Sequence, residues 1–260
     1  MKQELNSRLE ALPGRIGLYY ENLTTGETWS FRGEELYESA SVIKLPVYAA
    51  VMRLADQGKV DLREELFCRE EDKMPSCGAL SLLEGERYVD MQSLCNLMIA
   101  ISDNTATNLL LRRFGLDFLN EQFREIGLEK THLERLLFDA EGSRRGLENR
   151  IVPTEIGGLL ARLARGEYVS PDVSERMIAL LRRQQIKHKL QGYLPRGTVV
   201  AHKTGEDSGI TNDVGVVFAG QPFVLCFASN GTDVPAAERC LRQLALDLYR
   251  LSEEENPLGE

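Results

Sequence analysis

The spacing of apolar residues at the start of the chain predicts one short helix followed by two strands. Leu5, Leu9 and Leu12 lie on one helical face, and Pro13 with the glycine after it ends that segment. The next run, RIGLYYENLTTGETWSF, holds two β-prone stretches on either side of turn-forming residues, which is typical of a β-hairpin. Because an isolated hairpin is only marginally stable in water, these strands need partners from elsewhere in the chain.

The hydrophobic period becomes helical from about Ser41 to Arg183 and returns to strands after Pro195. Glycines follow the helical stretches at positions suited to helix C-caps, namely Gly58, Gly115, Gly127 and Gly166. Later, the runs GTVVAHK, TNDVGVVFA and PFVLCFAS predict three strands, and an amphipathic pattern predicts a helix from Val234 to Leu251. We therefore expect terminal segments that pair with each other around an inserted helical region.

Together these patterns predict an α/β (α+β) fold with a five-stranded antiparallel sheet flanked by helices. We expect one domain over residues 1–260, in which residues 1–38 and 190–260 form a discontinuous α/β subdomain and residues 39–189 an all-helical one. A chain of 260 residues buries enough surface for a stable core without disulfides.

Charge and composition exclude several classes of partner. The chain has 31 Lys and Arg against 40 Asp and Glu, a net charge of −9, which argues against nucleic acid as a partner. It has no apolar stretch near 20 residues, so we expect no membrane span. The first residues, MKQELNSRLE, do not resemble a signal peptide, which predicts a cytoplasmic protein, or a periplasmic or extracellular one if a leader was removed.

The sequence also gives no sign of a metal ion, an organic cofactor or a disulfide framework. Its five cysteines lack CxxC spacing, and we expect most of them to be reduced. The histidines His132, His188 and His202 share no metal-ligand spacing, so each is interpreted as structural. Nucleotide-binding glycine motifs are missing as well.

Three short segments carry the candidate chemistry: Ser41-Val42-Ile43-Lys44, Ser102-Asp103-Asn104 and Lys203-Thr204-Gly205. Ser41 and Lys44 are three residues apart at a predicted helix start, so their side chains share one face. A serine hydroxyl becomes a strong nucleophile only when a neighbour takes its proton, and a lysine must first lose its own. Burial and a second cation, for which Lys203 is the candidate, would lower the pKa of Lys44. The helix N-terminus would also direct the Ser41 N–H at an attacked carbonyl.

In this order, the three segments resemble the motifs of the penicillin-recognising serine hydrolases, above all the class A β-lactamases. Ser41 and Ser102 are 61 residues apart, and Ser102 and Lys203 are 101 apart, which is similar to the family spacing. The flanking text, SVIKLPVYAAV, MIAISDNTATNLLL and TNDVGVVF, resembles the family from about Arg15 to Tyr249. The resemblance implies a β-lactamase/transpeptidase-like fold and a serine hydrolase that opens the β-lactam amide through an acyl-enzyme at Ser41.

The resemblance also implies roles for the other motif residues. The Ser102 hydroxyl would relay a proton to the leaving nitrogen, and Asn104 would orient Lys44. The carboxylate of a small-molecule substrate would be bound by Lys203, Thr204 and Gly205, and the backbone N–H of Glu206 would be the second oxyanion donor. No cofactor and no metal are implied, and we expect a monomer.

The chain departs from class A enzymes in the segment LERLLFDAEGSRRGLENRIVP, between Leu133 and Pro153. Class A β-lactamases deacylate with a loop glutamate in the pattern E-x-x-x-N, and no glutamate here has an asparagine four residues later. Glu141 is the nearest candidate for the deacylating base. Acylation is therefore better supported than deacylation.

Two other interpretations stay open at this point. One is a cytoplasmic esterase, amidase or D-alanyl peptidase-like enzyme that acylates with β-lactams and clears them slowly. The other is a non-catalytic ligand-binding module of the same fold. The presence of Ser41, Lys44, Ser102 and Lys203 together argues against the second, because a site without chemistry has no physical need for two lysines beside a serine.

Overall fold

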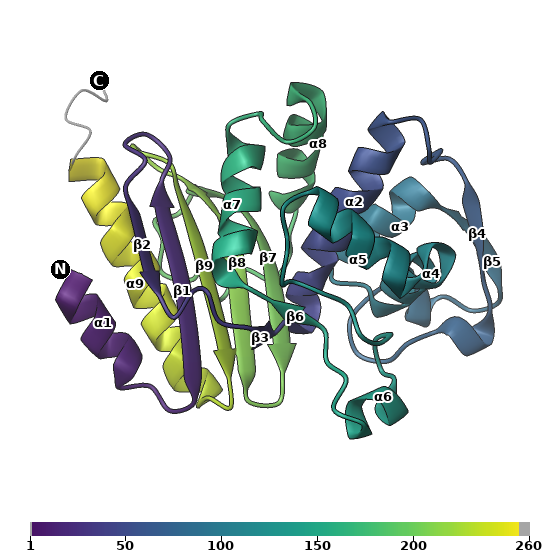
Figure 1. Cartoon of the computed structure of the whole chain (residues 1–260), viewed down its shortest axis with the longest axis horizontal. Helices are drawn as coiled ribbons and strands as arrows, with labels where there is room; N and C mark the ends of the chain where they lie inside the picture. Colours follow the sequence, from purple (N-terminus) through teal and green to yellow (C-terminus); the bar gives the residue numbers. More distant parts are fainter. Residues whose placement is uncertain (1, 255–260) are drawn as a thin grey trace.

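The computed structural model of the protein describes residues 2–254 and is built around a five-stranded antiparallel sheet with helices on both faces (Figure 1). The strands follow the order β2-β1-β9-β8-β7 and comprise β1 (Arg15–Asn22), β2 (Thr28–Phe31), β7 (Val199–Asp207), β8 (Ile210–Phe218) and β9 (Phe223–Asn230). Arg15 pairs with Asn230 and Asn22 with Phe223, so the two terminal segments meet along β1 and β9. The predicted five-stranded sheet is confirmed.

One face of the sheet is covered by the terminal helices, α1 (Lys2–Glu10) and α9 (Val234–Glu254). Leu241, Leu244 and Leu248 of α9 repeat at helical spacing and are buried against the sheet together with Leu5 and Leu9 of α1. The helix predicted from Val234 is confirmed and continues three residues beyond its expected end.

Most other helices lie on the opposite face or beyond its edge at β7 (Figure 1). They are α2 (Lys44–Asp56), α3 (Met91–Ala100), α4 (Asn104–Phe114), α5 (Leu116–Glu125), α7 (Pro153–Ala164) and α8 (Pro171–Leu181), with the short helix α6 (Ala140–Arg144) and the 3-10 turns η1 (Ala40–Ile43), η2 (Glu70–Asp72) and η3 (Leu80–Leu82). The predicted glycine caps are confirmed: Gly58 after α2 has a φ of +68°, and Gly115 after α4 has a φ of +82°.

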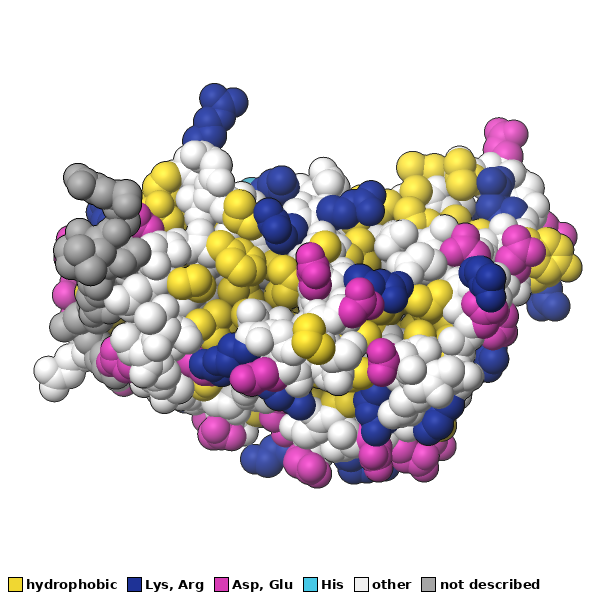
Figure 2. All heavy atoms as spheres, turned by 90° about the horizontal axis from the view of Figure 1, so that it is seen from above, with side chains coloured by type: hydrophobic (Ala, Val, Ile, Leu, Met, Phe, Trp, Pro, Cys, Tyr) yellow, Lys and Arg dark blue, Asp and Glu magenta, His cyan; other side chains and the backbone are white. Residues whose placement is uncertain are grey.

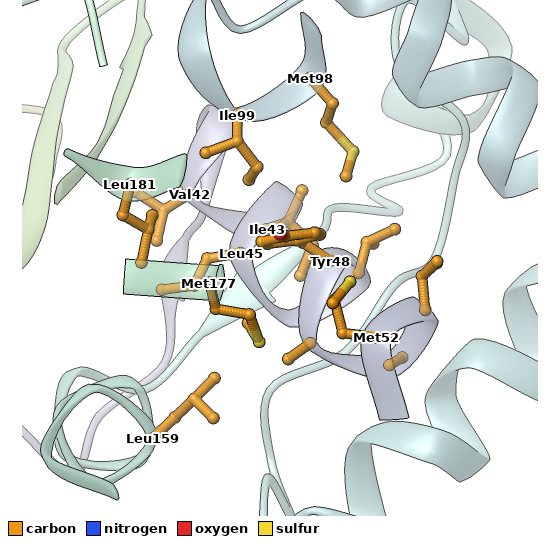
Figure 3. Close-up of a cluster of buried hydrophobic side chains, with 14 of the residues drawn as sticks. Val42, Ile43, Leu45, Tyr48, Met52, Met98, Ile99, Leu159, Met177 and Leu181 are labelled. Atoms are coloured by element: carbon orange, nitrogen blue, oxygen red, sulfur yellow. The ribbon is translucent and has the colours of Figure 1, made fainter. Parts of the chain in front are cut away.

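Helix α2 is the centre of this helical group. Apolar side chains surround it on every side, including Ile99 of α3, Leu159 of α7 and Leu181 of α8 (Figure 3). The hydroxyl of the buried Tyr168 also donates a hydrogen bond of 2.7 Å to the carbonyl of Ala49. A helix held in this way by neighbours on all sides is a rigid support for the residues at its N-terminus.

The expectation of an all-helical middle region is wrong, because two small sheets lie within it or at its border. Strands β4 (Glu65–Cys68) and β5 (Arg87–Asp90) pair with each other, and β3 (Tyr37–Glu38) pairs with β6 (Arg150–Ile151). The connection between β4 and β5 is long and carries no short hairpin turn. Strands of two residues, such as β3 and β6, are too short for their period to be recognised.

Basic and acidic side chains are interspersed over the face seen from above, with no extended basic patch on it (Figure 2). Within residues 2–254, no helix is long and apolar enough to cross a membrane.

Candidate active site

Ser41 lies in the 3-10 turn that leads into α2, three residues before Lys44, the first residue of that helix. The preceding residue, Ala40, has a φ of +43°, a left-handed conformation that a residue with a side chain rarely adopts. Ser102, the next candidate, has a φ of +58°. Strained backbone of this kind persists where the surrounding structure fixes it, and it concentrates at functional sites.

The amine of Lys44 is completely buried and has four close oxygen neighbours. Its Nζ lies 2.9 Å from Ser41 Oγ, 3.0 Å from Ser102 Oγ, 2.8 Å from the Ser102 carbonyl and 2.7 Å from Asn104 Oδ1. Burial, together with the charge of Lys203, holds the pKa of Lys44 well below its usual value. This shift favours the neutral amine, which is the form that can accept a proton.

In the neutral form of Lys44, hydrogen-bond accounting gives the direction of the contact with Ser41. The carbonyl of Ser102 and the side-chain oxygen of Asn104 can only accept, so they take the two hydrogens of a neutral amine. Asn104 is held in this orientation because its Nδ2 donates to the carbonyl of Pro75 at 3.1 Å. The lone pair of Lys44 is left for the serine hydroxyls, which is the arrangement that a general base needs.

Ser102 connects the two buried lysines. Its Oγ lies 3.0 Å from Lys44 Nζ and 3.2 Å from Lys203 Nζ, and Lys203 also donates to the Thr204 carbonyl at 2.7 Å. Burial lowers the pKa of Lys203 to about 7, with the charge of Lys189 acting in the same direction and Asp213 opposing it. A hydroxyl between two amines can pass a proton from one side to the other.

Asp103 fixes the loop that carries Ser102 and Asn104. Its buried carboxylate caps α4 by accepting from the N–H of Ala106 at 2.9 Å. It also accepts from the N–H groups of Ala79 and Leu80, at 2.7 and 2.9 Å. Asp103 thus makes the helix cap, which leaves its two neighbours free to contact Lys44.

The segment of Lys203, Thr204 and Gly205 runs along β7, at the edge of the sheet next to Ser41. A Cβ placed on Gly205 would lie 2.9 Å from the Ser39 carbonyl and 3.2 Å from the backbone nitrogen of Ser41. Only glycine lets the strand come so close to the nucleophile. Glu206 follows directly and lines the same cavity as Ser41.

Ser41, Asn104 and Glu206 border a cavity of about 570 Å³, large enough for a drug-sized molecule. Its lining comprises Glu38, Ser39, Ala40, Ser41, Ser76, Cys77, Asn104, Arg135, Leu137, Phe138, Asp139, Ala140, Ser143, Glu148, Asn149, Glu206, Asp207 and Ile210. The nucleophile is therefore reachable from solvent through a hollow bordered by β7 on one side and residues 135–149 on the other.

Lys189 is a residue of the site that the sequence interpretation missed. It is completely buried, and its Nζ donates to the Gly205 carbonyl at 2.8 Å and pairs with Glu206 Oε1 at 3.1 Å. It stabilises the part of β7 that faces Ser41. Nothing in the run QIKHKLQG distinguishes this lysine from a solvated one, so only the fold reveals it.

The chain matches the model of the β-lactamase enzyme family over residues 1–251. It belongs to this family. The β-lactamase of Rhodobacter capsulatus is 27% identical over 232 residues, which cover 86% of this chain and 78% of that protein. The structure of the β-lactamase from Sphaerobacter thermophilus DSM 20745 superposes with a TM-score of 0.87 at 29% identity, covering 96% of both chains.

A second similar structure is that of PBP-A, with a TM-score of 0.87 and 30% identity over 96% of this chain and 95% of the other. It is a leucine-to-glutamate mutant of PBP-A, solved as an acyl-enzyme complex with penicillin G. The resemblance to class A β-lactamases and the fold expected from it are thus confirmed.

The structure does not bring Glu141 to the cavity of this β-lactamase-family protein. Asp139 caps α6 by accepting from the N–H of Gly142 at 2.9 Å, which leaves Glu141 exposed in the first turn of that helix and absent from the cavity lining. The expectation that Glu141 is the deacylating base is therefore not supported. Glu148 does line the cavity, but it is paired with Arg135 at 2.7 Å.

Leu137 is a residue of this loop that hydrogen bonds hold at the cavity. The side chain of Asn108 on α4 accepts from the N–H of Leu137 and donates to its carbonyl, both at 2.9 Å. The loop thus presents an apolar side chain here. Among residues 2–254, no carboxylate forms a hydrogen bond or ion pair with Ser41, Lys44 or Ser102.

Proposed function

We propose that the protein hydrolyses the amide bond of β-lactams through an acyl-enzyme at Ser41. The observation that carries this proposal is the buried Lys44 amine, 2.9 Å from Ser41 Oγ, with both of its hydrogens committed to carbonyl oxygens. Family membership supports the same reaction. Sites of this geometry activate serine by removing its proton as it attacks.

We assign each step of the acylation to a group of the site. Lys44 takes the proton of Ser41 as the hydroxyl attacks the lactam carbonyl, and the backbone N–H groups of Ser41 and Glu206 stabilise the oxyanion. Ser102 passes a proton to the departing nitrogen. Lys203, with Thr204 and Gly205, binds the substrate carboxylate. All of these groups come from one chain, which supports a protein that acts as a monomer.

We further propose that release of the acyl group is the slow step. A deacylating water needs a base to take its proton. The loop instead contributes Leu137 to the cavity lining, and its apolar side chain cannot act as a base. The structure of a leucine-to-glutamate mutant of PBP-A with a penicillin acyl group is consistent with this view. The same observation favours a second candidate, a penicillin-binding peptidase or esterase that shares the acylation step.

Intact-protein mass spectrometry after mixing with benzylpenicillin tests the proposal. We expect the wild type to gain the mass of one penicillin and to lose it slowly, at the rate at which excess drug is hydrolysed. Ser41→Ala should gain no mass. An adduct on Ser41→Ala, or a wild type that neither gains mass nor hydrolyses the drug, would contradict Ser41 as the nucleophile. Hydrolysis by the wild type without an accumulating adduct would overturn the slow step.

The pH dependence of acylation should report the charge of Lys203. Because its pKa is lowered to about 7, the amine loses its proton as the pH rises above that value, and its attraction for the substrate carboxylate disappears. We expect kcat/KM for acylation to fall above pH 7 in stopped-flow measurements. Lys203→Arg, which stays charged, should move this fall to higher pH, and a β-lactam methyl ester without the carboxylate should show little of it. An unchanged profile in both cases would contradict the assignment.

A further inference from the structure

Three potential metal ligands converge next to the end of β7, on side chains that the hydrolytic reaction does not use. His188 comes from the segment between α8 and β7, Glu206 from β7, and Glu238 from α9. His188 Nε2 lies 3.6 Å from Glu206 Oε1 and 3.7 Å from Glu238 Oε1. The three ligand atoms all lie within 4.8 Å of one another.

These separations are close to those found around a bound transition metal. Zn²⁺ binds imidazole nitrogen and carboxylate oxygen at about 2.0–2.2 Å, and tetrahedral geometry then places two ligand atoms roughly 3.4 Å apart. The distances from His188 to the two carboxylates exceed that value by only a few tenths of an ångström. Small rotations of Glu206 and His188, which are about half exposed, can close this difference.

Neighbouring groups already hold these side chains in place. The Thr211 hydroxyl donates to Glu238 Oε1 at 3.2 Å, and Arg242 Nη1 donates to Glu238 Oε2 at 3.3 Å and to the carbonyl of His188 at 3.0 Å. A carboxylate oxygen has two lone-pair directions, so it can accept such a bond and still bind a metal. Hydrogen bonds of this kind orient metal ligands in known sites.

We propose that His188, Glu206 and Glu238 bind one divalent transition-metal ion of the Zn²⁺ or Cu²⁺ type, with water completing the coordination. The imidazole favours these ions over Mg²⁺ and Ca²⁺, which prefer oxygen ligands alone. The two carboxylates are balanced by Lys189 and Arg242, so the affinity is moderate. The ion takes no part in the acyl transfer; it links β7, α9 and the segment that carries His188.

Isothermal titration of the full-length, chelator-treated protein with ZnCl₂ tests this site. We expect one Zn²⁺ per chain, no heat of binding from MgCl₂, and a rise in the unfolding temperature with Zn²⁺, because the ion binds only the folded arrangement. His188→Asn and Glu238→Gln should each weaken binding at least tenfold.

Two control variants test whether Zn²⁺ binding depends on these three residues in particular. His132→Asn removes another half-buried histidine, which lies 4.0 Å from Glu134, and Cys77→Ser removes a thiol that lines the active-site cavity. Both should leave Zn²⁺ binding unchanged. The proposal is overturned if the wild type binds no Zn²⁺, if His188→Asn binds Zn²⁺ as tightly as the wild type, or if binding is lost in either control variant. The unfolding temperatures of the metal-free variants show that each one is folded.

Discussion

Replacing Lys44 with methionine should slow acylation of Ser41 by about 10²–10⁴-fold, the usual contribution of a positioned general base. Methionine has a similar length and keeps the site filled, but it cannot take the proton of Ser41. The rate at which benzylpenicillin adds to the protein, followed by intact mass, measures the effect directly. Ser41 itself is unchanged in this variant, so the loss reports the contribution of Lys44.

Lys44→Arg is the matched control for charge. A guanidinium fills much of the same space and donates to the same carbonyls, but it stays protonated and cannot act as a base. We expect it to be nearly as slow as the methionine variant. If Lys44→Arg acylates within tenfold of the wild type, the positive charge matters and Lys44 is not the base.

Lys44→Met should also change how the free energy of unfolding depends on pH. Because burial lowers the pKa of Lys44 in the folded state, the unfolded chain binds more protons between the folded and unfolded pKa values, so the lysine makes stability increase with pH in that range. Urea unfolding at several pH values should therefore show a steeper rise for the wild type than for Lys44→Met. This slope separates loss of the base from general misfolding.

Most of the acylation machinery could be predicted from the sequence because it resides in short, contiguous motifs. Ser41 and Lys44 are close through helix geometry alone, and Asn104 follows Ser102 by two residues. The pairing of the two terminal segments was also predictable, since neither could form a stable sheet alone. What the sequence could not give is the distance between motifs, such as the 3.2 Å from Ser102 Oγ to Lys203 Nζ.

The features that the sequence did not reveal depend on contacts between distant segments. Lys189 resembles any surface lysine until the fold buries it beneath Gly205. The proximity of His188, Glu206 and Glu238 was not predictable either, because they lie 18 and 32 residues apart and match no metal-binding motif. Spacing rules recognise ligands on one element and fail when each comes from a different one.

The path of the loop after α5 could not be predicted from the sequence either. Choosing Glu141 by its place in the sequence assumed that the loop runs as in class A enzymes. Instead, the cap made by Asp139 starts a helix at Ala140 and directs Glu141 to solvent, while Asn108 fixes Leu137 at the cavity. The path of this loop depends on a few polar contacts, and the pattern of hydrophobic residues does not predict such contacts.

Replacing Leu137 with glutamate should therefore speed deacylation, by about 10²–10⁴-fold if the new carboxylate acts as a general base. The clamp of Asn108 on the backbone of Leu137 holds the side chain at the cavity lining that Ser41 shares. Partial burial would raise the pKa of the carboxylate toward the range in which it can take a proton from water. The decay of the penicillin adduct, followed by intact mass, measures the gain.

Two variants decide whether that gain comes from a base at this position. Leu137→Gln has the same shape as the glutamate but cannot take a proton, so its adduct should persist as in the wild type. Glu141→Gln should also leave the adduct lifetime unchanged, because the exposed Glu141 does not line the cavity. Faster decay of the adduct in Leu137→Gln would mean that any polar side chain at this position lets water reach the acyl group, without acting as a base. A longer-lived adduct in Glu141→Gln would restore Glu141 as the base, and the deacylation step would then require the loop to move.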